Sequence, residues 1–134
     1  ETYVKKLQIE ARIIGDMCLN HVIPAAVRYQ NILIENVKGM KDIFGDDYLN
    51  YCASEIETLK KISTYINNVS ADVEGLVEAR KKANRIEAIA ERAKVYSYEV
   101  KDMMEKVRVS ADNLEMLIDD EVWPLPKYRE LLFF

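Results

Sequence analysis

The chain has 134 residues and a net charge of −4, with 49% apolar and 31% charged residues. This length suits one domain with a sizeable core, and the composition argues against wholesale disorder. The acidic balance argues against a nucleic-acid surface, because neutralising phosphates requires a basic face. No run of 18 apolar residues occurs, so the sequence predicts no membrane span.

Few residues favour turns, and this points to long helices. Only four glycines and three prolines occur, whereas an all-β or α/β chain normally needs more turn residues. Cys18 and Cys52 lie far apart and have no partner histidines in a metal-binding spacing. We interpret them as buried thiols in a reducing compartment rather than as a disulfide. These features together predict an all-α protein in the cytoplasm.

The first predicted helix spans about residues 2–44 and has two apolar stripes. One stripe consists of Leu7, Ala11, Ile14, Cys18, His21 or Val22, Ala25 and Ile32. The other consists of Ile9, Ile13, Met17, Val27 and Ile34. A helix that is apolar on two sides needs cover on more than one face. Pro24 lacks a backbone donor and clashes with the preceding turn, so we expect a kink there.

The second and third predicted helices span about residues 47–83 and 85–122. The second helix has two possible starts: Asp46 or Asp47 could cap it, or it could begin later, with Ser54 and Glu57 in capping-box positions. Apolar residues recur every three or four positions in both helices. In the second they are Leu59, Ile62, Ile66, Val69, Val73 and Leu76; in the third they are Ile86, Ile89, Ala93, Tyr96, Val100, Met103, Val107, Leu114 and Leu117.

The two apolar patterns differ in phase by one residue near positions 82–86. This phase break, beside Asn84 with Glu87 three residues later, predicts a tight turn with Asn84 as the cap of the third helix. A continuous helix of about 100 Å is the alternative. Short connections between long helices favour antiparallel neighbours. The predicted fold is therefore an antiparallel bundle of three long helices, the first kinked at Pro24.

Residues 123–134 form a short apolar tail. Pro124 ends the third helix, and Pro126 can open a last short turn. We predict that the tail docks on its own bundle or on a neighbouring chain, although a frayed terminus is the alternative. The docking candidates are Trp123, Leu125, Tyr128, Leu131, Leu132 and Phe133 in the tail, and Ile9, Ile13 and Met17 on the first helix.

An acidic cluster, Asp119-Asp120-Glu121, lies just before this tail, at the predicted carboxyl end of the third helix. The helix dipole disfavours anions at that position. The cluster is either a solvated acidic surface or the binding site of a basic partner, and the sequence leaves both possibilities open.

Residues that could carry out chemistry are sparse. His21 is the only histidine, and a single histidine on an apolar helix face is more often a satisfied core residue than a metal ligand. No glycine-rich phosphate loop or activated nucleophile is recognisable. The basic run "ARKKANR", residues 79–85, is interpreted as a solvated turn rather than a binding patch. We therefore predict no catalytic, cofactor-binding or metal-binding residue.

Three stretches of the sequence together resemble a known family. They are "EARIIGDMCLNHVIPAAVRYQNILIENVKGMKDIFG" (residues 10–45), "VEARKKAN" (77–84) and "DDEVWPLPKYRELLF" (119–133). These stretches are similar to the carboxy-terminal helical region of type III glutamine synthetases, whereas residues 46–76 add little. The resemblance covers nearly the whole chain and implies a single helical domain that belongs to a larger polypeptide.

The resemblance implies a structural or assembly role. Members of this family make glutamine from glutamate and ammonia with ATP and Mg or Mn, in ring-shaped cytoplasmic homo-oligomers. Their catalytic motifs lie upstream and do not occur here, so this chain alone is expected to be non-catalytic. Its expected partners are the catalytic domain of the same polypeptide and neighbouring subunits. A free-standing helical-bundle adaptor that binds partner helices is the alternative function.

Overall fold

The computed structural model describes residues 2–119 and 122. Its helical elements are α1 (Thr2–Met17), the π-helical turn η1 (Cys18–Val22), α2 (Ile23–Phe44), the 3-10 turn η2 (Gly45–Asp47), α3 (Leu49–Asn84), α4 (Ile89–Val95), the π-helical turn η3 (Tyr96–Val100) and α5 (Lys101–Glu115). The described residues contain no strand. The all-α prediction is therefore confirmed, with three long helical segments.

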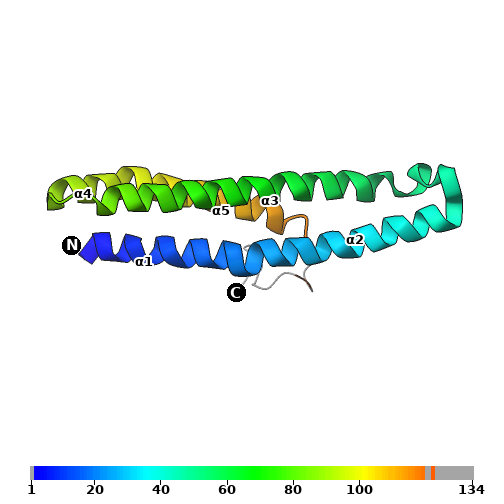
Figure 1. The fold of residues 1–134 in the computed structure, drawn as a ribbon, viewed down its shortest axis with the longest axis horizontal. Helices are drawn as coiled ribbons and strands as arrows, with labels where there is room; N and C mark the ends of the chain where they lie inside the picture. The colour runs from blue at the N-terminus through cyan, green and yellow to red at the C-terminus, as the bar shows by residue number, and fades with distance from the viewer. Residues whose placement is uncertain (1, 120–121, 123–134) are drawn as a thin grey trace, which may run out of the picture.

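The three segments lie side by side (Figure 1). The chain runs out along α1 and α2, returns along α3, and runs out again through α4, η3 and α5. Helix α3 packs against both α2 and α5, and α1 packs against α3 and α5. Because α5 ends near the middle of α3, the outer part of the α2–α3 hairpin consists of two helices only.

The core lies where α1, α3 and α5 run together. Among the described residues Tyr96 is the largest fully buried side chain, and it belongs to the same core cluster as the buried apolar residues of α3 and α5. The buried members of the expected α3 pattern are Ile62, Val69, Val73 and Leu76; those of the third segment are Tyr96, Val100, Val107 and Leu114. The 3.6-residue period explains this burial, because it places these side chains on one side of each helix.

The first segment contains a π-helical turn just before Pro24. The Ile23 amide donates to the carbonyl of Cys18, five residues back, instead of four. Such a turn inserts about one extra residue into the helix and shifts the phase of everything that follows. Cys18, Val22 and Ala26, spaced by four, are consequently all buried. The bend at Pro24 itself stays a prediction.

Because of this phase shift, part of the apolar stripe that we expected to be buried in the first helix is exposed. Ile32 is 53% exposed, although the α-helical spacing placed it with Leu7 and Ala11. His21 is exposed on the turn, and Val22 takes the buried position instead. The expectation that His21 is a core residue is therefore wrong, because the π turn rotates it away from the core.

The junction between α3 and α4 differs in detail from the prediction. Helix α3 ends at Asn84, the chain leaves helical structure through residues 85–88, and α4 begins at Ile89. The third segment thus starts four residues later than expected, and its last helix ends at Glu115. The alternative prediction of one continuous helix of about 100 Å is therefore wrong. The N-cap of α4 is Ala88, which makes no side-chain capping bond, so Asn84 is not the predicted cap.

The start of α3 also corrects the capping predictions. The N-cap is Tyr48 without a side-chain capping bond, and α3 is kinked at Cys52, whose φ of −134° and ψ of 25° are not helical, so Ser54 lies just after this kink. Asp47 accepts a hydrogen bond from the Asn50 side chain instead of capping the backbone. Gly45, with φ of 61°, and the bond from the Tyr48 amide to the Gly45 carbonyl lead the chain directly from α2 into α3.

Candidate docking surface

Helix α1 has one buried and one exposed apolar face. Val4, Leu7 and Ala11 are buried against the bundle. Ile9 is 59% exposed and Ile13 is 54% exposed, and Met17 is half-buried. We call Ile9, Ile13 and Met17 the α1 face. Three apolar side chains spaced four residues apart form a continuous strip on a helix.

Exposed apolar side chains continue along the first segment. Leu19, Val27, Ile32 and Ile34 are between 40% and 53% exposed. Scattered exposed apolar residues are normal, but a helix that keeps so many along its length resembles an element with a missing partner. The candidates predicted in the tail, Trp123, Leu125, Tyr128, Leu131, Leu132 and Phe133, lie outside the described residues.

A cavity of about 250 Å³ lies between α1 and α3. Its polar lining consists of Arg12, Asp16 and Arg80, and the rest is mainly apolar. The Nε atom of Arg80 is buried and has no hydrogen-bond partner. The cavity is therefore lined by a guanidinium with unused bonding capacity. No sequence motif marked it, because its residues come from helices about 60 positions apart.

Two polar contacts inside the bundle also escaped the sequence. The Asn84 Oδ1 atom accepts hydrogen bonds from the Tyr96 hydroxyl (2.5 Å) and from Gln8 Nε2 (3.2 Å). The Ser110 hydroxyl donates to Asp72 Oδ2 at 2.6 Å. Both contacts join different segments, so they fix the helices relative to one another. Only the presence of a buried tyrosine, whose hydroxyl needs a partner, could have indicated the first.

The two cysteines are buried and form no disulfide, as predicted. Burial raises the pKa of the Cys18 thiol from its ordinary value of 9.0 to about 11. At neutral pH this side chain is therefore a protonated, unreactive thiol that fills space beneath the π turn.

The described residues offer little for metal or membrane chemistry. Among them, no three histidine, cysteine, aspartate or glutamate side chains gather in a way that could hold a metal ion. None of the helices in this described part has the length and apolarity that a membrane crossing requires. The α1 face, with Ile9 and Ile13 exposed, stays the candidate docking surface.

The comparisons with known proteins agree on one family. Residues 1–41 match the family model described as the glutamine synthetase C-terminal domain. Over 99% of its length, the chain is 47% identical to a glutamine synthetase of Bacteroides fragilis (strain YCH46), 28% identical to a type-3 glutamine synthetase of Dictyostelium discoideum, and 28% identical to a glutamine synthetase of Butyrivibrio fibrisolvens. It spans 18% of the first two relatives and 19% of the third. Over nearly its whole length the chain is therefore similar to one part of glutamine synthetases, and its first 41 residues match their C-terminal domain.

Proposed function

We propose that this chain is a structural or assembly domain of a larger glutamine synthetase. In this proposal it forms an antiparallel three-helix bundle, kinked at Pro24, and docks on the rest of its polypeptide or on a neighbouring subunit. The observation that carries the proposal is the α1 face, because Ile9 and Ile13 are each more than half exposed while the opposite side of α1 is buried.

The energetics support a covered α1 face in the parent protein. Burying an exposed isoleucine side chain completely contributes about 1.5–3 kcal/mol. Ile9 and Ile13 lie one turn apart on α1, so one partner surface can cover both. The cavity with Arg12 and Arg80 could accept a polar side chain of that partner. The same face would serve a free-standing adaptor, but the similarity to glutamine synthetases favours a domain of a larger enzyme.

The activity that we propose for the parent enzyme is formation of glutamine from glutamate and ammonia, with ATP and Mg or Mn. We place it in the cytoplasm as a homo-oligomer. The described residues of this chain do not fit a divalent metal, since they bring no group of three ligands together. We therefore assign no catalytic step to this domain, and the chemistry would belong to other parts of the parent polypeptide.

A double substitution in the full-length parent enzyme tests this proposal. Ile9→Glu with Ile13→Glu places two carboxylates on the α1 face. We expect a smaller oligomer by mass photometry, together with reduced synthetase activity. Val109→Glu is the control, because Val109 is 57% exposed on α5 and is not part of the α1 face. An unchanged oligomer with full activity in the double variant would contradict the proposal.

The apolar tail is a second docking element in this proposal, argued from its sequence. Trp123 is the only tryptophan of the chain, so its fluorescence reports on this region alone. We expect a blue-shifted native emission that moves to the red on unfolding, because docking would remove the indole ring from water. A native emission that already matches that of the unfolded chain would show an undocked tail.

A further inference from the structure

The tip of the α2–α3 hairpin is the most conspicuous surface not used by the proposed function. Ile43 is 75% exposed and Leu49 is 52% exposed on either side of the η2 turn. The exposed rings of Phe44 and Tyr51 stack with centroids 4.2 Å apart, which stabilises the turn. We call Ile43, Leu49 and the carboxylates of Asp42, Asp46 and Asp47 the hairpin tip. It projects beyond α5, so no third helix of the described residues covers it (Figure 1).

The hairpin tip is acidic. Asp42, Asp46 and Asp47 are exposed there, and Lys41 is the only basic residue between positions 41 and 57. Lys41 lies over the Tyr48 ring, 5.6 Å from its centroid. Within the part of the chain that the structure describes, none of these three aspartates forms an ion pair. An apolar surface flanked by unpaired carboxylates fits a partner that is both basic and apolar.

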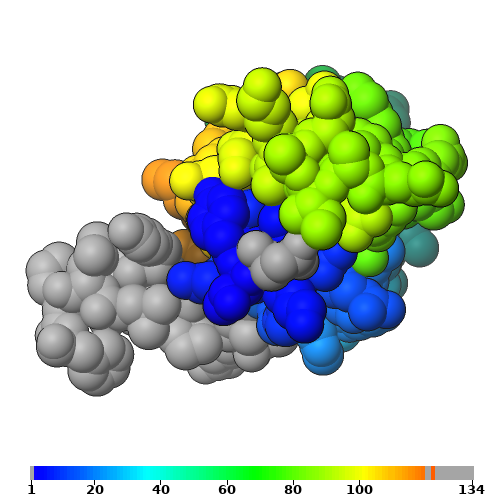
Figure 2. All heavy atoms as spheres, turned by 90° about the vertical axis from the view of Figure 1, so that its left-hand side faces the viewer, coloured from blue at the N-terminus to red at the C-terminus, as the bar shows by residue number. Residues whose placement is uncertain are grey.

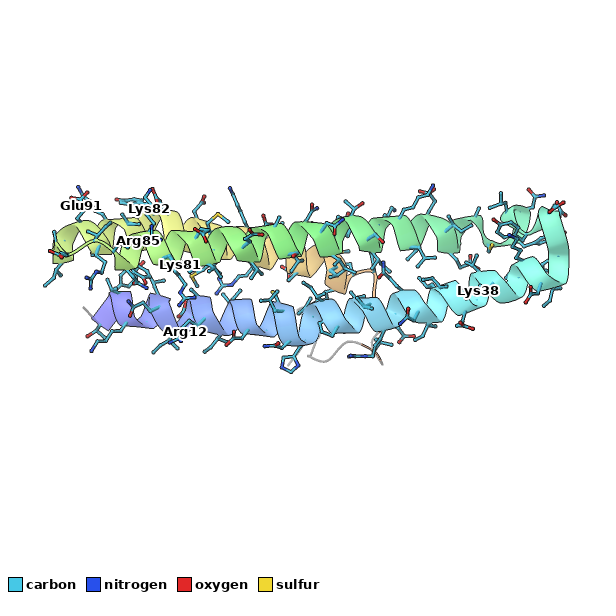
Figure 3. The ribbon with its side chains drawn as sticks, in the orientation of Figure 1. Arg12, Lys38, Lys81, Lys82, Arg85 and Glu91 are labelled. Atoms are coloured by element: carbon cyan, nitrogen blue, oxygen red, sulfur yellow. The ribbon has the colours of Figure 1, made fainter. Side chains whose placement is uncertain are left out.

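The opposite end of the same molecule carries both basic and apolar side chains. Lys81, Lys82 and Arg85 lie together at the α3–α4 junction (Figure 3), and no acidic residue occurs between positions 79 and 86. The start of α1, with exposed Lys5 and Lys6, lies beneath this junction (Figure 2). Ile89 adds an apolar side chain that is 62% exposed. We call Lys81, Arg85 and Ile89 the basic end.

The positive charge of the basic end is only partly neutralised. Lys82 pairs with Glu99 at 3.0 Å, and Lys81 lies 4.0 Å from Glu78. No ion pair among the described residues involves Arg85. The described residues therefore place an acidic apolar tip at one end of the bundle and a mainly basic surface, with Glu87 and Glu91 beside it, at the other. Such charge separation steers association and sets the relative orientation of two copies.

We propose that the hairpin tip of one chain docks onto the basic end of a second copy. The two surfaces lie at opposite ends of one molecule, so they can meet only between chains. Because each copy contributes a different surface, the contact is heterologous and can repeat from copy to copy. End-on contacts are small, so we expect weak, salt-sensitive association. This inference deepens the proposed assembly function by naming a surface and its partner.

Charge-reversal variants of the chain test the contact by sedimentation at low ionic strength and rising concentration. The wild-type chain should exceed its monomer mass of 15.5 kDa progressively, and added salt should reverse the increase. Lys81→Glu with Arg85→Glu should abolish association, as should Asp42→Lys with Asp46→Lys. Mixing the two variants in equal amounts should restore it, because each reversed end then meets a complementary end.

The control is Lys61→Glu with Lys106→Glu, which changes the same charge at exposed positions along α3 and α5. It should associate like the wild type, and circular dichroism should show equal helix content in all the proteins. A wild-type chain that stays monomeric, or a mixture that fails to associate, would overturn the proposal. Association that persists in both reversed variants would also overturn it, while leaving docking through the α1 face intact.

Discussion

At the scale of single residues, the hydrogen bond between Asn84 and Tyr96 stabilises the packing of η3 against the end of α3. Tyr96 is fully buried, so its hydroxyl depends on the Asn84 acceptor at 2.5 Å. Asn84→Ala should lower the free energy of unfolding by about 1–3 kcal/mol, because it leaves a buried donor without this partner. Tyr96→Phe should cost about 1 kcal/mol. Urea titrations of both variants measure these changes.

A double-mutant cycle makes this prediction specific. Once Tyr96→Phe has removed the hydroxyl, adding Asn84→Ala should cost much less than it does alone. Tyr98→Phe is the control, since Tyr98 is 73% exposed and should be neutral. Strictly additive costs would show that Asn84 acts in some other way than through Tyr96.

Because of Cys18, the stability of the folded protein should decrease at alkaline pH. Its pKa rises from 9.0 to about 11 on burial, so above pH 9 the unfolded chain loses this proton while the folded chain keeps it. The stabilising contribution of Cys18 is therefore complete below pH 9 and is lost as the pH rises towards 11. Compared with Cys18→Ala, the wild type should lose stability across this window, measured by denaturation at several pH values. A constant difference between the two proteins would contradict the assignment.

At the scale of the elements, the two faces of α1 should respond differently to truncation. Leu7 is 5% exposed and packs in the core, whereas Ile9 is 59% exposed. Leu7→Ala should destabilise the isolated chain by about 2–5 kcal/mol, because it opens a cavity. Ile9→Ala should change stability by less than about 0.5 kcal/mol. Thermal or urea unfolding compares the two directly, and equal losses would mean that Ile9 is covered in the isolated chain.

The regular parts of the helices could be predicted from the sequence because periodic burial has a local signature. Ile62, Val69, Val73 and Leu76 are spaced by three, four or seven and are all buried. The one-residue change of phase after them also marked the region where α3 gives way to α4. The helix period alone is enough to detect this change of phase, because an apolar stripe that rotates away from the core cannot stay buried.

The features of the fold and the site that the sequence did not predict depend on contacts between segments. The π turn at Cys18–Val22 has no local motif, yet it decides that Val22 is buried and that His21 and Ile32 are exposed. The role of Asn84 was misjudged because a cap motif and a tertiary hydrogen bond use the same side chain. On the candidate docking surface, two stripes on one helix indicated that one face would lack cover in a single bundle. The Arg80 cavity depends on how α1 packs on α3, which the sequence alone does not specify.

At the scale of the whole molecule, the isolated chain should be strongly helical and should lack ligase activity. Its described residues form long helices joined by short turns, so far-ultraviolet circular dichroism should show a helical spectrum. Chemistry would need positioned acids, bases or metal ligands, and the single histidine of the chain is exposed. With glutamate, ammonia, ATP and Mg or Mn, we therefore expect no glutamine formation above background. The full-length parent enzyme, purified in the same way, is the positive control. Turnover that follows the 15.5 kDa chain through successive purification steps would contradict this assignment and would place catalytic groups within the bundle.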